Sequence, residues 1–379
     1  MKQSEFGWNL SNYIFNKNYN FNREKILNVC GEENIIDANN VISNWKNYQP
    51  TPLLNLEKLS TKLGINNIFY KDESQRFHLK SFKALGGAYA VEKVAKENKE
   101  ITISTATAGN HGRSVAWGSQ KLGLKCKIFI SEYVSEARAD EMRKLDAEII
   151  RVKGNYEKSL EACISNSKAN GWKIVQDVAW ENYETVPKLT MAGYSMMIKE
   201  ISTQTDQYIT HIFLQAGVGG MASGAIAGIA KYFKRIPKII IVEPENADCV
   251  LKSIDKGALQ KVDIKKESIM GGMSCGEVSL IPWRILRESV NCCTSVPDDH
   301  VAKTVAMLRN KYFYDKEIVG GECSTPGIIS LISTCENKNV KKKLEINENS
   351  NILVIGCEGD ADKKLYENLL SKGLTQLSK

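Results

Sequence analysis

Short apolar runs alternate with amphipathic segments of helical length from about residue 66 onward. The apolar runs are rich in β-branched residues, which favour strands. The runs that predict strands are N-I-F-Y, I-T-I-S-T, C-K-I-F-I, A-E-I-I-R-V, W-K-I-V-Q, H-I-F-L-Q, K-I-I-I-V and N-I-L-V-I. Between them, helices are predicted by G-R-S-V-A-W-G-S-Q-K-L-G, Y-E-K-S-L-E-A-C-I-S-N-S-K-A-N-G and A-S-G-A-I-A-G-I-A-K-Y-F. This alternation predicts an α/β fold with mostly parallel sheets.

Residues 248 to 300 are less periodic and contain G-G-M-S-C-G and V-S-L-I-P-W. We expect loops here that cover a site or contact another subunit. Ligands of parallel α/β sheets bind beyond the carboxyl ends of the strands. The segments that follow the predicted strands are therefore the first places to look for chemistry.

Composition sets limits on the class of protein. A chain of 379 residues suggests two or three domains, and 42% hydrophobic with 25% charged residues is typical of a globular protein. The net charge of +7 comes with no long single-sign block, so we expect no nucleic-acid partner. The apolar runs are too short to span a bilayer, and we expect no membrane partner.

Ten cysteines without an apolar leader at the N-terminus predict free thiols in the cytoplasm. The chain has no C-x-x-C pair, and its four histidines lie far apart in sequence, so we expect no metal site.

A glycine-rich loop, Q-A-G-V-G-G-M-A-S-G at residues 215 to 224, follows one predicted strand and opens a helix. Glycines let the backbone turn tightly and aim several N–H groups at one point, where the helix dipole favours an anion. The loop therefore predicts a phosphate cradle made by Gly217, Val218, Gly219, Gly220 and Met221.

The same loop has a second interpretation. Gly217, Gly219 and Ala222 fit the G-x-G-x-x-G/A dinucleotide fingerprint, and Glu243 ends the next strand where a ribose-binding carboxylate is expected. A tight turn without a ligand is a third interpretation. The loop alone leaves these alternatives open.

Two further loops follow strands. In S-T-A-T-A-G-N-H-G, residues 104 to 112, Thr107, Asn110 and the backbone N–H groups suit an α-carboxylate, and Asn110 can also donate to a phenolate-like oxygen. His111 is either a site residue or a cap-region residue without chemistry. In V-I-G-C-E-G-D-A-D, residues 354 to 362, a neutral Cys357 can hydrogen-bond a ring nitrogen without protonating it, or simply fill the core.

Two lysines, Lys80 and Lys83, stand where H-L-K-S-F-K-A-L-G-G leads into a helix. The positive end of the helix dipole, together with burial, would lower the pKa of a lysine there. A neutral amine is what carbonyl chemistry needs, whereas a solvated surface lysine is the alternative.

S-F-K at 81–83, A-G-N-H at 108–111, the glycine loop and C-E-G at 357–359 together resemble the fold type II pyridoxal-phosphate enzymes, the tryptophan synthase β family. The resemblance implies that pyridoxal 5'-phosphate is the cofactor and that Lys83 forms a Schiff base with it. Phe82, Asn110, the glycine loop and Cys357 would bind the cofactor, and Lys80 would be a solvated neighbour.

The resemblance also implies the architecture. We expect two open, mostly parallel α/β domains with the cofactor in the cleft between them. The large domain would comprise residues 1–87 and 179–379, and the small domain residues 88–178. The family further implies a homodimer.

Within this family, several stretches resemble the ammonia-lyases that act on 2,3-diaminopropionate. These stretches are Y-Q-P-T-P-L, K-D-E-S-Q-R-F, F-K-A-L-G-G-A-Y-A, V-Q-D-V-A-W-E, L-Q-A-G-V-G, I-V-E-P-E-N-A-D-C and E-G-D-A-D. The resemblance implies α,β-elimination to pyruvate and ammonia. Lys83 would remove the α-proton of the L isomer, and Asp177 would hold or protonate the departing β-amino group. The substrate would be bound by Thr107, Ala108, Gly109 and His111.

One departure keeps alternatives open. These lyases carry an aspartate where this chain has Ala108, and that aspartate is the base for the D isomer. T-A-G-N-H-G is instead similar to the loop of threonine and serine dehydratases, some of which also have a cysteine at the position of Cys357. A dehydratase and a β-replacement synthase are thus the nearest alternatives. A nicotinamide-dependent dehydrogenase and a ligand sensor without activity are more distant ones.

Overall fold

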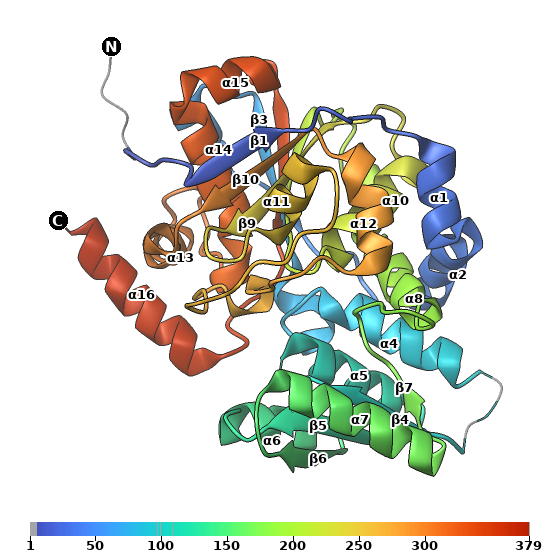
Figure 1. The fold of residues 1–379 in the computed structure, drawn as a ribbon. Coiled ribbons are helices and arrows are strands. Elements are labelled where there is room, and N and C mark those ends of the chain that lie inside the picture. Colours follow the sequence, from blue (N-terminus) through green and yellow to red (C-terminus); the bar gives the residue numbers. More distant parts are fainter. Residues whose placement is uncertain (1–5, 97, 99, 108, 379) are drawn as a thin grey trace.

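Two mostly parallel sheets with helices packed on them form the protein, as the computed structural model shows for residues 6–96, 98, 100–107 and 109–378 (Figure 1). The larger sheet has seven strands in the order β1-β10-β9-β8-β11-β3-β2. In chain order, its strands are β1 (Asn12–Phe15), β2 (Leu53–Asn55), β3 (Asn67–Asp72), β8 (His211–Gln215), β9 (Lys238–Pro244), β10 (Cys292–Val296) and β11 (Asn351–Gly356).

Only the two edge strands of this sheet run antiparallel to their neighbours, β1 against β10 and β2 against β3. The other pairings are parallel. The central strands β8 and β11 are buried along their whole length, because helices cover both faces of the sheet. The predicted α/β fold with mostly parallel sheets is confirmed.

Helices pack on both faces of the large sheet. α14 (Pro326–Glu336) packs against β8, β9, β10 and β11, and α10 (Gly220–Tyr232) packs against β8 together with α8, α9 and α12. The remaining helices around this sheet are α1 (Arg23–Cys30), α2 (Glu32–Ser43), α3 (Glu57–Leu63), α8 (Thr185–Tyr194), α9 (Met196–Gln204), α11 (Cys249–Lys256), α12 (Leu280–Ser289), α13 (Val301–Arg309), α15 (Lys338–Leu344) and α16 (Lys363–Leu377).

The smaller sheet lies below the large one in Figure 1 and has the order β6-β5-β4-β7. Its strands are β4 (Thr102–Ala106), β5 (Lys125–Ser131), β6 (Ala147–Val152) and β7 (Lys173–Ile174), and its helices are α5 (Asn110–Lys121), α6 (Glu136–Arg143) and α7 (Tyr156–Asn170). α4 (Lys83–Val94) packs against both α5 and α8, so it joins the two units. The domain limits at residues 88 and 178 stay a prediction.

The expectation of loops holds for residues 257–279, which carry only a short 3-10 turn at Gly271–Met273 and lie against the glycine loop at Gly217. It is wrong for the flanking segments, where α11, α12 and β10 lie. Pro282 obscured α12, although the first turn of a helix tolerates proline. β10 is the segment C-C-T-S-V, which is short and has only two β-branched residues, so its strand signal is weak. Thr294 is buried in it and donates to the Ile241 carbonyl at 3.1 Å.

No helix in the described part of the chain is long and apolar enough to cross a membrane.

A buried ionic network anchors the end of β3. Lys71 Nζ lies 2.6 Å from Glu200 of α9. Arg76 lies 2.7 Å from both Glu73 and Glu200, and Thr51 donates to Glu73 at 2.5 Å. The four charged side chains are at most 1% exposed, so each of these charges depends on its partners.

This network stands immediately before an unusual turn. Phe77, His78 and Lys80 have left-handed backbone conformations, with φ of 48°, 61° and 58°. Such conformations cost roughly 1–3 kcal/mol each and persist only where the surroundings enforce them. The network therefore fixes the start of the turn that leads to Lys83.

Glu200→Gln should lower the free energy of unfolding by about 3–5 kcal/mol, because it leaves the buried charges of Lys71 and Arg76 without their shared carboxylate. Urea unfolding of the two proteins measures the difference. Glu136→Gln is the matched control, since Glu136 pairs with Arg143 at the surface, and it should change the stability much less. Equal effects of the two substitutions would contradict the role of the network.

Candidate active site

The strand order brings the candidate loops together. β8, β11 and β3 are neighbours and run in the same direction, so the glycine loop, Cys357 and the turn before Lys83 all leave the same edge of the large sheet. In the small sheet, β4 and β7 are parallel neighbours, so the loop with Asn110 and the segment with Asp177 also lie side by side. The site is built where these two edges meet.

Lys83 is the first residue of α4, and its Nζ lies 2.5 Å from the Asp177 carboxylate. The rings of Phe82 and Tyr194 flank the amine, with centroids 5.5 and 5.6 Å from Nζ. The backbone before Lys83 is tied to the loop after β11, because the Phe82 N–H donates to the Cys357 carbonyl at 3.0 Å. Lys83 and Asp177 thus connect the two sheet units directly.

The expected lowering of the Lys83 pKa is wrong for this arrangement. Burial favours the neutral amine, but the Asp177 carboxylate outweighs it and raises the pKa of Lys83. Burial would in turn raise the pKa of Asp177, yet the positive charge of Lys83 and its hydrogen bond hold that pKa well below its usual range. In this structure the pair is therefore an ammonium and a carboxylate.

Lys80 also differs from expectation. It is not a freely solvated neighbour, because its Nζ lies 2.7 Å from Asp360 and its side chain is only 30% exposed. The pair holds the turn against the loop that follows β11, and the Gly359 N–H adds a bond to the Lys80 carbonyl at 2.9 Å.

The glycine loop between β8 and α10 is as tight as its sequence predicts. Gly219 has a left-handed φ of 92°, and a Cβ there would lie 2.8 Å from Leu286 and 3.0 Å from Pro282. α10 begins at Gly220, and the first N–H groups of a helix have no partners within it. Together with the helix dipole they suit an anion, so residues 217–221 fit a phosphate group.

Cys357 follows β11 and is 4% exposed, and its thiol donates to the Cys323 carbonyl at 3.1 Å. Burial raises the pKa of this thiol far above its usual value, so it stays neutral. An amine, a phosphate cradle and a neutral thiol converge here. The amine and the cradle fit the aldehyde and the phosphate of pyridoxal phosphate, and the thiol would suit the ring nitrogen if it turned away from the Cys323 carbonyl.

The loop after β4 is only partly described, and Ala108 lies outside the described residues. Thr107 Oγ1 accepts from the Gly109 N–H at 3.3 Å. Asn110, predicted to donate to the cofactor, here donates to Glu358 at 2.6 Å and accepts from Arg113. The Asn110 amide has a second N–H, which can donate to a cofactor oxygen while the first is held by Glu358.

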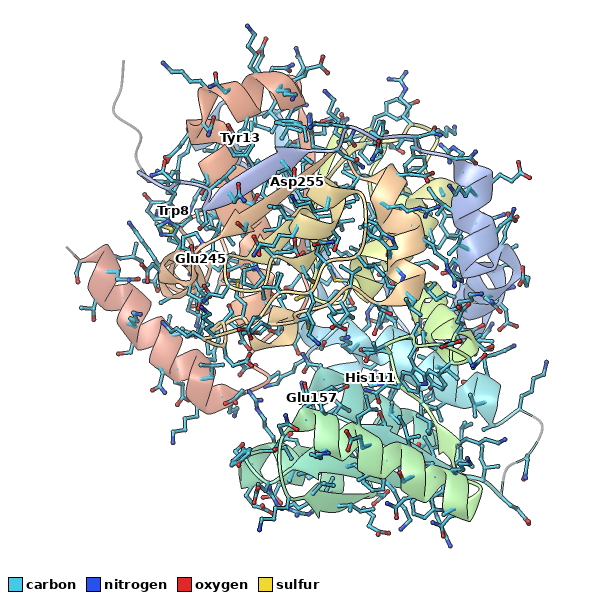
Figure 2. All side chains as sticks on the ribbon, in the orientation of Figure 1. Trp8, Tyr13, His111, Glu157, Glu245 and Asp255 are labelled. Carbon is cyan, nitrogen blue, oxygen red and sulfur yellow. The ribbon has the colours of Figure 1, made fainter. Side chains whose placement is uncertain are left out.

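His111 is more than a cap residue. It is 4% exposed and lies at the junction of the two units, where α4 and α5 meet (Figure 2). Its Nε2 donates to the Val175 carbonyl at 3.0 Å, and its Nδ1 lies 3.7 Å from Asp177 Oδ2. Lys83, His111 and Asp177 therefore form one contact group.

Three residues at this site escaped the sequence interpretation. Glu358 lies inside the recognised E-G-D-A-D stretch but was given no role. Cys275 lies against the glycine loop, with its sulfur 3.0 Å from where a Cβ of Gly217 would stand. Tyr194 carries no local signal, because it is one of several apolar residues of α8.

Glu322, Cys323 and Glu358 place possible metal ligands within 4.8 Å of one another. Protein donors already engage this group, since the Glu358 carboxylate accepts from Asn110 and from the Cys323 N–H at 3.1 Å. Burial and the neighbouring Glu358 raise the pKa of Glu322 to about 8. At neutral pH, Glu322 is therefore mostly an uncharged acid, which suits a cation poorly.

The dinucleotide interpretation fails on Glu243. Its side chain is fully buried and accepts from the N–H groups of Val250 and Leu251 at 2.7 and 2.8 Å. Both carboxylate oxygens are thus engaged by the start of α11, so Glu243 is not free to bind a ribose.

Comparisons with known proteins agree with this site. The family model described as pyridoxal-phosphate dependent enzyme matches residues 45–355. Diaminopropionate ammonia-lyase of Escherichia coli (strain K12) is 35% identical over 351 residues, covering 86% of this chain and 88% of that protein. The biosynthetic L-threonine dehydratase of the same organism is 28% identical over 262 residues, covering 69% of this chain and 48% of that protein.

A solved structure is similar over the whole fold. The crystal structure of diaminopropionate ammonia lyase from Escherichia coli in complex with an aminoacrylate-PLP azomethine reaction intermediate has a TM-score of 0.88 and 33% identity. The match covers 97% of this chain and 98% of that one.

Gly219→Ala should weaken the binding of pyridoxal phosphate by about tenfold or more, because the added Cβ meets Leu286 and Pro282 in a left-handed conformation. Titration of the cofactor-free protein, followed by absorbance, measures the dissociation constant. Gly271→Ala is the control, since a Cβ at Gly271 meets nothing within 4 Å. Unchanged affinity in Gly219→Ala would contradict the cradle.

Proposed function

Because this chain belongs to the family of pyridoxal-phosphate-dependent enzymes that includes the diaminopropionate ammonia-lyases, we propose that it removes ammonia from L-2,3-diaminopropionate. Elimination gives one ammonia and an unsaturated amine, and one water molecule then hydrolyses its imine form, so the products are pyruvate and two molecules of ammonia. Family membership confirms the predicted fold type II and the predicted cofactor. The observation that carries the substrate proposal is the Asp177 carboxylate against Lys83, an anion placed beside the reacting amine.

Lys83 and Asp177 have separate roles in this reaction. The bound cofactor would withdraw electrons from the substrate's α-carbon. Lys83 takes the α-proton, a contribution of about 10²- to 10⁴-fold in rate for a positioned base. Asp177 holds the substrate's β-ammonium group, and the Cβ–N bond breaks with its electron pair remaining on nitrogen, so that ammonia departs.

The pairing of Lys83 with Asp177 explains how the base becomes available. Asp177 stabilises the ammonium form of Lys83. A substrate ammonium that takes the place of Lys83 against Asp177 removes that stabilisation, and burial then favours the neutral amine. A substrate with a cationic β-substituent therefore makes Lys83 available as the neutral base. A hydroxyl group has no charge to neutralise Asp177, so Lys83 would stay protonated.

Substrate binding would use the loop that opens α5. Thr107, Gly109 and the N–H groups at the start of the helix suit the α-carboxylate. We further propose selectivity for the L isomer, because Ala108 has no side chain that can act as a base for the D isomer.

A hydroxy-amino-acid dehydratase is the second candidate. It is favoured by the T-A-G-N-H-G loop and by the similarity to threonine dehydratase over 262 residues. It does not explain Asp177, because a carboxylate has no proton to donate and does not stabilise a departing hydroxide. A β-replacement synthase is the third candidate, since the same elimination product can be captured by a nucleophile.

The proposal includes two features that the reaction does not require. The homodimer rests on the family resemblance. The cytoplasmic location rests on the ten cysteines, all of which are unpaired, eight of them buried.

The cofactor-loaded protein should release two ammonia molecules per pyruvate from L-2,3-diaminopropionate and turn over the D isomer far more slowly. Ammonia and 2-oxo acid are quantified together, with L-serine and L-threonine as parallel substrates. One ammonia per 2-oxo acid from the hydroxy amino acids, with both diamines inert, would move the protein to the dehydratases.

A further inference from the structure

His111 has a fixed protonation pattern. A backbone carbonyl can only accept a hydrogen bond, so the contact of Nε2 with the Val175 oxygen places the ring proton on Nε2. Burial lowers the pKa of His111 and keeps the ring neutral. Nδ1 therefore presents a lone pair.

That lone pair has no donor within the protein. Nδ1 is buried and makes no hydrogen bond in the part of the chain that the structure describes. Its nearest charged neighbour is Asp177 Oδ2 at 3.7 Å, which is also an acceptor. Two buried acceptors that face each other without a donor between them are unfavourable, so the arrangement suits a ligand that donates to both.

Lys83 Nζ satisfies only one of them. It lies 2.5 Å from Asp177 Oδ2, and no bond from it to His111 accompanies this contact. A group that replaces Lys83 beside Asp177 needs at least two N–H bonds to satisfy both acceptors, and a positive charge to match the carboxylate. An ammonium group meets both conditions, while a hydroxyl has a single hydrogen to donate.

We propose that His111 Nδ1 and the Asp177 carboxylate together form the binding site for the substrate's β-ammonium group, which makes His111 a specificity-determining residue. This inference rests on the proposed function and adds a second acceptor to it. The two acceptors keep the β-nitrogen protonated until the Cβ–N bond breaks. Ammonia then leaves with the electron pair of that bond, and neither His111 nor Asp177 gains or loses a proton.

Two substitutions separate the two ring nitrogens. The amide of glutamine in His111→Gln can still donate to the Val175 carbonyl from the position of Nε2, but it removes the acceptor at Nδ1. The shorter side chain in His111→Asn can place its amide oxygen near the position of Nδ1. If His111 had only a structural role, His111→Asn, which loses the bond to the Val175 carbonyl, would not preserve substrate preference better than His111→Gln, which keeps that bond.

The experiment compares kcat/KM for L-2,3-diaminopropionate with kcat/KM for β-chloro-L-alanine, whose leaving group has no N–H. In His111→Gln the ratio of the two values should fall by about tenfold or more, mainly through KM, and in His111→Asn it should recover most of that loss. The absorbance of the bound cofactor confirms that both variants are loaded. A second readout is binding alone: in cofactor-loaded Lys83→Ala protein, the preference for L-2,3-diaminopropionate over L-serine should fall with His111→Gln.

The outcomes distinguish this inference from the proposed function. If the wild-type protein eliminates ammonia from the diamine and His111→Gln leaves the ratio unchanged, the inference is wrong and the function stands. If the wild-type protein acts on β-chloro-L-alanine but not on the diamine, the proposed function fails and the inference fails with it. If His111→Gln does not load with cofactor, His111→Asn decides, because a tenfold fall in its ratio would overturn the inference.

Discussion

The ion pair between Lys83 and Asp177 is the contact on which the site depends. The two groups come from different sheet units, Lys83 from the start of α4 and Asp177 from the segment after β7. Their side chains are 25% and 14% exposed, so water screens the pair only weakly. Each charge therefore sets the protonation of the other, and the pair also brings the two sheet edges together.

The rest of the fold can be understood as support for this pair. On one side, the network around Glu200 and Arg76 fixes the end of β3, and the left-handed turn that follows aims Lys83 at the cleft. On the other side, the Ala179 N–H donates to Ser279 at 2.8 Å, and Ser279 donates in turn to the Val218 carbonyl at 3.0 Å. Asp177 and the glycine loop are thus positioned by a shared set of bonds.

Local patterns in the sequence identified most of the strands and proposed site residues, several of which the structure gathers at one cleft. Buried parallel strands such as β8 and β11 are mostly apolar runs, which local patterns detect. The glycine loop is recognised from its density of glycines between a strand and a helix. β10 escaped because its burial depends on partners distant in sequence. Candidate catalytic residues can be predicted from local sequence, because their chemistry depends on residue type and on the strand or helix next to them.

The sequence did not show which side chains form ion pairs and hydrogen bonds with residues that are distant in the chain. The pKa of Lys83 was predicted in the wrong direction, since the carboxylate that controls it lies 94 positions away in the chain. Asn110 likewise has Glu358 as its partner over 248 positions. The lone pair of His111 follows from a contact with the Val175 carbonyl, which no motif encodes. Electrostatics of this kind require the folded geometry, because each shift is a balance between burial and a neighbour that only the fold brings close.

The most direct test of this account is to find which lysine carries the cofactor. The cofactor-loaded protein is reduced with borohydride and digested, and the modified peptide is identified by mass spectrometry, with Lys80→Ala as the matched variant. We predict that the modification lies on Lys83 in both the wild-type and the Lys80→Ala protein. Modification of Lys80, or of any lysine outside this cleft, would contradict the account.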